Sequence, residues 1–209
     1  MRSLPSPYVG YDVMAKWNSP SWDDLTRDVI RRRLVEIPER RFLSETEWRT
    51  LEDVAHRLVP QPDRAHPIPI APWIDQKLHE DRRDGFRYDD MPALREAWSL
   101  GLKGIDEESR RRFGAVFVSL PGEQQDAVLR AIQTGDVGGG VWDRLPAQRF
   151  FSTVLLKEIV GEYYAHPLAW NEVGFGGPAS PRGYVRLGLD QQDPWEAPAA
   201  DDLETSARD

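Results

Sequence analysis

Residues 146–164 read PAQRFFSTVLLKEIVGEYY, and this stretch decides the fold. Its apolar residues recur at intervals of three and four, the spacing of one face of an α-helix. That face is broad enough for a buried central helix: Phe150, Phe151, Val154, Leu155, Ile159 and Val160. No segment alternates apolar and polar residues as a strand does, and no βαβ unit or repeat is visible. The sequence predicts an all-α protein, a single compact helical domain of about six to seven helices.

The clearest helix start lies at Ser44-Glu45-Thr46-Glu47, the pattern of a capping box. The Ser44 side chain is placed to accept from the Glu47 amide, and the Glu47 carboxylate to accept from the Ser44 amide. A proline-rich linker is expected at 60–72 and a flexible glycine-rich tip at 135–140. Apolar spacing and flanking prolines predict the other helices at about 22–35, 48–58, 92–102, 106–119 and 121–133, with a short one beginning near Pro72.

The two ends of the chain differ in composition from its middle. Residues 1–20 are rich in proline, tyrosine and serine, so we expect an extended arm whose aromatic side chains lie on a surface. Residues 190–209 hold seven acids and one base, so this segment carries −6 of the net charge of −8. We therefore predict an arm (1–20), a helical domain (21–189) that ends in a long irregular loop, and an acidic, flexible tail (190–209).

Composition excludes several classes of protein. Charged residues make up 30% and hydrophobic residues 40% of the 209 residues, as in globular proteins, and no apolar run is long enough for direct membrane insertion. A near-neutral body with an acidic tail argues against nucleic-acid binding. The chain has no cysteine, so it forms no disulfide and no thiolate site. Because the first residues contain neither a secretory nor a twin-arginine signal, we expect a cytoplasmic protein, periplasmic only if exported with its partner.

No pattern in the chain predicts catalysis. The four histidines, at positions 56, 66, 79 and 166, fall on different expected elements and form no HxxxH or HExxH pair. No serine lies in a GxSxG motif, and Gly174-Phe175-Gly176 follows a helix without a further helix to hold a pyrophosphate. We therefore predict no catalytic, metal-binding or cofactor-binding residue in this chain.

The segment 163–184 is the exception, because aromatic rings alternate there with glycines and prolines. Rings anchor protein partners, glycines allow close backbone approach and prolines stiffen a loop. One interpretation is that the loop folds back over its own core; the other is that it also binds a partner. His166 is expected to orient the loop by hydrogen bonding. The residues that we predict to bind a partner are Tyr163, Tyr164, His166, Trp170, Phe175, Gly176, Gly177, Arg182 and Tyr184.

The order of short motifs along the chain is distinctive. They are Phe42-Leu43-Ser44 with Trp48 and Leu51, Arg57-Leu58-Val59-Pro60, Phe150-Phe151, Glu162-Tyr163-Tyr164-Ala165-His166-Pro167, Trp170, Gly174-Phe175-Gly176-Gly177-Pro178, Pro181-Arg182-Gly183-Tyr184 and Asp193-Pro194-Trp195-Glu196. Through these motifs the chain resembles the gluconate 2-dehydrogenase subunit 3 family over roughly residues 40–196. The block from Glu162 to Tyr184 is the most specific of them.

The resemblance implies a small, helical, non-catalytic subunit that accompanies a large FAD-dependent dehydrogenase of the glucose–methanol–choline class. The FAD and the catalytic base would belong to that large subunit, which oxidises a sugar or polyol, and a cytochrome subunit is a further partner in such complexes. The small subunit would stabilise, mature or help export the flavoprotein. Two features depart from the family: the twin-arginine signal of many members is missing, and without cysteine the disulfide that joins some members to their partner is impossible.

Two alternatives stay open at this point. One is an enzyme with its own site near Glu162, His166 and Asn171, which would require a cleft that gathers these side chains. The other is a stand-alone helical interaction module that binds through the acidic tail. Deleting that tail would abolish binding by such a module, whereas an accessory subunit that docks through its aromatic loop would lose little.

Overall fold

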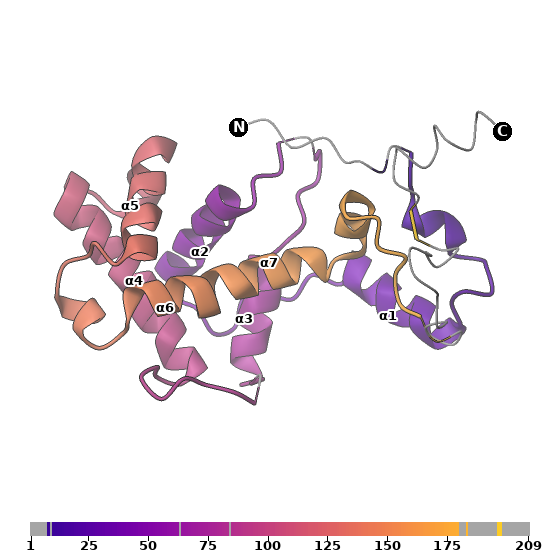
Figure 1. Ribbon diagram of the computed structural model, residues 1–209, viewed down its shortest axis with the longest axis horizontal. Coiled ribbons are helices and arrows are strands. Elements are labelled where there is room, and N and C mark those ends of the chain that lie inside the picture. Colours follow the sequence, from indigo (N-terminus) through magenta and orange to yellow (C-terminus); the bar gives the residue numbers. More distant parts are fainter. Residues whose placement is uncertain are drawn as a thin grey trace, which may run out of the picture. The chain divides into compact units, whose positions relative to one another are not determined.

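The computed structural model describes residues 8, 10–62, 64–83, 85–179, 183 and 196–197, and within them every regular element is a helix (Figure 1). The all-α prediction is therefore confirmed. None of the described helices is long and apolar enough to cross a membrane. The α-helices are α1 (Asp24–Val35), α2 (Glu45–Leu58), α3 (Ala71–His79), α4 (Leu94–Phe113), α5 (Gly122–Thr134), α6 (Ala147–Arg149) and α7 (Lys157–Tyr164). A π-helix, η4 (Phe150–Leu156), joins α6 to α7, and the 3₁₀-helices are η1 (Val13–Lys16), η2 (Phe117–Ser119), η3 (Gly140–Asp143) and η5 (Pro167–Glu172).

The chain contacts divide these elements into two compact units. The helical unit is Pro38–Tyr163 and contains α2 to α6 and most of α7. The terminal unit combines the described residues of the segments 2–37 and 164–209, and so contains η1, α1 and η5. The division into an arm, a domain and a tail at residues 20 and 190 stays a prediction, because few residues beyond 179 belong to the described part of the chain.

Helix α4 is the centre of the helical unit and contacts α2, α5, η3 and η4. Figure 1 shows α4 and α5 side by side, as these contacts require. The predicted break near residue 104 was wrong, because 94–113 form one helix. Gly104 does not interrupt it: a Cβ built there would lie 2.6 Å from Cζ2 of Trp142, so the missing side chain lets that indole lie on the helix. Gly101 makes the same kind of room for Phe150.

The start of α2 confirms the capping box. The Ser44 amide donates to the Glu47 carboxylate (2.9 Å), and the Glu47 amide donates to Ser44 Oγ (3.3 Å). The sequence did not reveal how the preceding turn is held. Asp75 of α3 is fully buried, and its carboxylate accepts from the backbone amides of Arg41 (2.6 Å), Phe42 (3.1 Å) and Leu43 (2.8 Å). One side chain therefore ties the entrance of α2 to α3.

Residues 146–164 form the predicted central helix, but its middle is wound as a π-helix. A π-turn shifts the backbone pairing by one residue, which leaves carbonyl groups with altered partners. Two hydroxyl groups donate to such carbonyls one turn earlier: Ser152 Oγ to Gln148 O (2.9 Å) and Thr153 Oγ1 to Arg149 O (2.8 Å). The apolar face is buried as predicted at Phe150, Phe151, Val154, Leu155 and Ile159.

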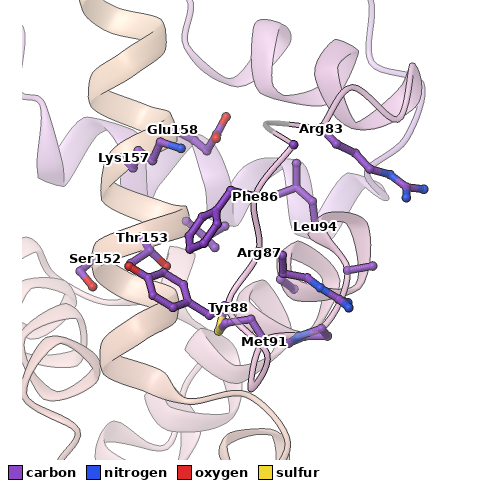
Figure 2. Close-up of a pocket in the computed structure, with 15 residues that line it drawn as sticks. Arg83, Phe86, Arg87, Tyr88, Met91, Leu94, Ser152, Thr153, Lys157 and Glu158 are labelled. Carbon is purple, nitrogen blue, oxygen red and sulfur yellow. The ribbon is translucent and has the colours of Figure 1, made fainter.

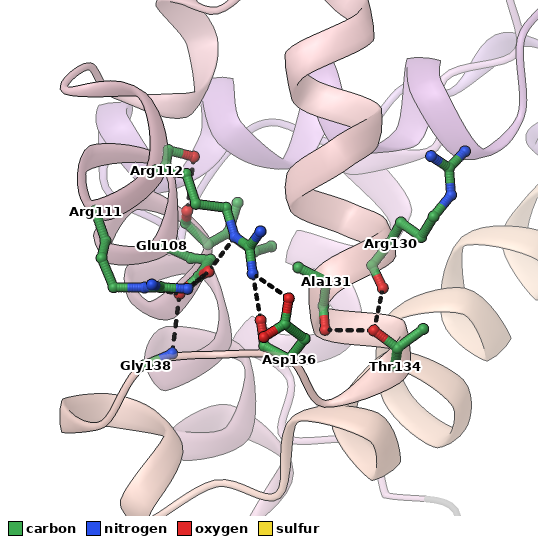
Figure 3. Close-up of polar contacts among 10 residues, drawn as sticks. Glu108, Arg111, Arg112, Arg130, Ala131, Thr134, Asp136 and Gly138 are labelled. Carbon is green, nitrogen blue, oxygen red and sulfur yellow. Dashed lines mark hydrogen bonds and ion pairs between the residues drawn. The ribbon is translucent and has the colours of Figure 1, made fainter.

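The glycine-rich segment 135–140 is held by charged groups of α4 (Figure 3). The Glu108 carboxylate, 1% exposed, pairs with Arg111 and Arg112 of its own helix and accepts from the backbone amide of Gly138 (3.2 Å). Arg112 also pairs with Asp136 (2.8 Å). Glu108 and Arg112 thus tie this segment to α4.

This network makes stability depend on pH. Burial by itself raises the pKa of Glu108, but hydrogen bonds from Arg111, Arg112 and the Gly138 amide outweigh it and hold the pKa below the ordinary value of 4.5. A carboxylate whose pKa is lowered by folding stabilises the folded state at pH values above its ordinary pKa. This stabilisation is lost as the pH falls through the folded-state pKa. We expect the free energy of unfolding, measured by urea titration, to fall more steeply below pH 4.5 in the wild type than in Glu108→Gln. Parallel pH profiles would contradict this assignment.

Candidate partner-binding site

The terminal unit is built around two tryptophans, Trp22 and Trp170, which are 1% and 8% exposed. They form a buried cluster with Val13 and Ile30, and Tyr11, Met14, Trp17 and Leu34 pack against it. Regular structure was expected to stop after residue 164, yet η5 follows. His166 is the N-cap of η5 and its Nδ1 accepts from the Leu168 amide (3.3 Å), while Pro167 suits the first helical position. This bond matches the orienting role expected for His166.

Hydrogen bonds join the C-terminal loop to residues near the start of the chain. The Val13 amide donates to Asn171 Oδ1 (2.9 Å), and Trp22 Nε1 donates to the Pro178 carbonyl (3.2 Å). Tyr11 Oη donates to the Phe175 carbonyl (3.3 Å). The described part of the loop therefore packs on its own unit, as the first interpretation of the sequence proposed.

Two glycines let this loop approach aromatic rings closely. Gly174 and Gly177 have φ of 65° and 73°, a left-handed conformation that favours glycine. A Cβ at Gly174 would lie 2.8 Å from Cζ of Tyr8, and one at Gly177 would lie 2.7 Å from Cζ2 of Trp22. The glycines therefore serve both the turn and the packing of the rings.

The structure separates the predicted partner-binding residues into buried and exposed ones. Tyr163, His166, Trp170, Gly176 and Gly177 are buried. Tyr164 and Phe175 are exposed, at 41% and 39%. Arg182 and Tyr184 lie outside the described residues. Of the described candidates, two rings thus present a large apolar surface to solvent.

The exposed rings border a hollow of about 490 Å³, here named the aromatic hollow. Trp170 lines it, and its Nε1 donates to the Tyr164 carbonyl (2.9 Å). The Trp170 and Phe175 rings are perpendicular, at 86° and 5.4 Å between centroids. The residues that line the hollow are Tyr8, Tyr164, Trp170, Val173, Gly174, Phe175, Glu196 and Ala197. The predicted partner-binding residues did not include Tyr8, Val173, Gly174, Glu196 and Ala197. The aromatic character of the arm pointed toward Tyr8, and the motifs Gly174-Phe175-Gly176-Gly177-Pro178 and Asp193-Pro194-Trp195-Glu196 contain Gly174 and Glu196.

Two side chains named in the enzyme alternative make hydrogen bonds to the backbone of the terminal unit. His166 Nδ1 and Asn171 Oδ1 each accept from a backbone amide of the terminal unit. Both side chains therefore help to hold the backbone of the terminal unit. Within the described residues, no group of three histidine or acidic side chains is placed to hold a metal ion.

A second hollow, of about 660 Å³, lies in the helical unit beside the loop before α4 (Figure 2). Figure 2 shows the Phe86 and Tyr88 rings turned toward the helix that carries Ser152 and Thr153. Both of those hydroxyl groups donate to backbone carbonyls of their own helix. The Glu158 carboxylate on the same wall accepts from Lys77 Nζ at 2.9 Å. These polar groups therefore have structural partners within the helical unit.

Comparisons with curated proteins and with solved structures found no match. A scan of family models matched residues 45–177 to gluconate 2-dehydrogenase subunit 3. The match covers well over half of the chain, including α2 to α7 and the loop through Gly177. The chain belongs to the gluconate 2-dehydrogenase subunit 3 family.

Proposed function

We propose that this protein is a non-catalytic accessory subunit that docks on a large FAD-dependent sugar or polyol dehydrogenase and stabilises or matures it. The family match supports membership of a dehydrogenase complex. The observation that carries the docking proposal is the exposure of Tyr164, Val173 and Phe175 around one hollow, at 41%, 47% and 39%. FAD and the catalytic base then belong to the partner.

The backbone around Phe175 is held in place by hydrogen bonds, which favours docking. Phe175 is fixed by its backbone amide, which donates to Trp170 O (3.0 Å), and by its carbonyl, which accepts from Tyr11. Rings held in this way lose little conformational freedom on binding, so more of their buried apolar area contributes to affinity. Aromatic anchors of this kind supply much of the binding energy in protein interfaces.

Co-purification tests the proposal. The tagged full-length chain is purified from its source organism, and flavin absorbance in the eluate is measured. We expect Tyr164→Ser/Phe175→Ser to lower flavoprotein recovery at least about tenfold, because two interface anchors are removed. The matched control is Phe86→Ser/Tyr88→Ser, which removes two exposed rings from the helical unit (72% and 40%) and should leave recovery unchanged.

Two outcomes count against the proposal. The first is a wild-type chain that elutes alone and monodisperse, without flavoprotein. The second is equal recovery with both double variants, provided that circular dichroism shows both folded. Truncation after Ala197 removes four of the seven acids of the tail and tests the acidic-tail alternative. An accessory subunit that docks through the aromatic hollow keeps its recovery, whereas a module that binds through the removed residues loses it.

A further inference from the structure

We draw no further inference here: the strongest candidate, the hollow of about 660 Å³ beside the loop before α4 in the helical unit, carries none, because nothing in the structure shows what covers the exposed rings of Phe86 and Tyr88 that line it.

Discussion

Asp75→Ala is expected to lower the free energy of unfolding by about 3 kcal/mol, because a buried donor left unpaired costs about 1–3 kcal/mol and several lose their acceptor here. The Asp75 carboxylate is fully buried and accepts from the amides of Arg41, Phe42 and Leu43. Alanine leaves these amides without a partner and leaves a space beside the entrance of α2. Urea titration of the full chain, followed by circular dichroism, measures the loss.

Two variants define what the Asp75 result means. Asp75→Asn keeps one accepting oxygen and a similar volume, so its free energy of unfolding should lie between those of the wild type and Asp75→Ala. Asp89→Ala removes an exposed aspartate that accepts from the neighbouring Asp90 amide, and should change stability by less than about 0.5 kcal/mol. If Asp75→Ala lowers the free energy of unfolding no more than Asp89→Ala does, the buried carboxylate does not hold the turn.

Gly101→Ala is expected to lower the free energy of unfolding by about 3 kcal/mol, near the upper end of the usual penalty for overpacking a core. A Cβ at Gly101 would overlap the Phe150 ring, which is fully buried and packs edge-to-face on Trp98 at 6.2 Å between centroids. Either that ring or the crossing of α4 with η4 must then shift. Thermal and urea unfolding of the variant measure the loss.

Gly161→Ala is the matched control and should change stability in the opposite direction. Gly161 is exposed in α7, and nothing lies within 4 Å of a Cβ built there. Alanine in a helix interior is favoured over glycine by about 0.5–1 kcal/mol, so this variant should gain stability. Phe150→Leu should partly rescue Gly101→Ala, since the smaller side chain vacates space. Additive losses in the double variant would refute the steric explanation.

The sequence predicted the helical class because apolar spacing is local information. The capping box at Ser44–Glu47 and the central helix at 146–164 needed no knowledge of distant residues. The predicted break near Gly104 was wrong because it depends on a residue that is distant in the sequence. A helix-interior glycine usually weakens a helix, and only the arrival of Trp142, 38 positions later, shows that this glycine serves packing.

The sequence predicted which segment forms the candidate site, but not which of its side chains are exposed. Alternation of rings and glycines identified the loop, yet composition does not say which rings turn inward. Trp170 is buried while Phe175 is exposed, and that difference depends on contacts with residues such as Val13, which lies 158 positions from its partner Asn171. Glu196 lies at the hollow next to Ala197, whose amide donates to the Gly174 carbonyl, and apolar spacing does not indicate such a long-range bond.

The pairing of Val13 with Asn171 and of Trp22 with Pro178 has a consequence for the order of events during synthesis. The helical unit, Pro38–Tyr163, can begin to pack while the ribosome is still translating. The terminal unit cannot close until its second half has left the exit tunnel, more than 150 residues after Val13. A chain released before its C-terminal segment is made therefore lacks the aromatic hollow.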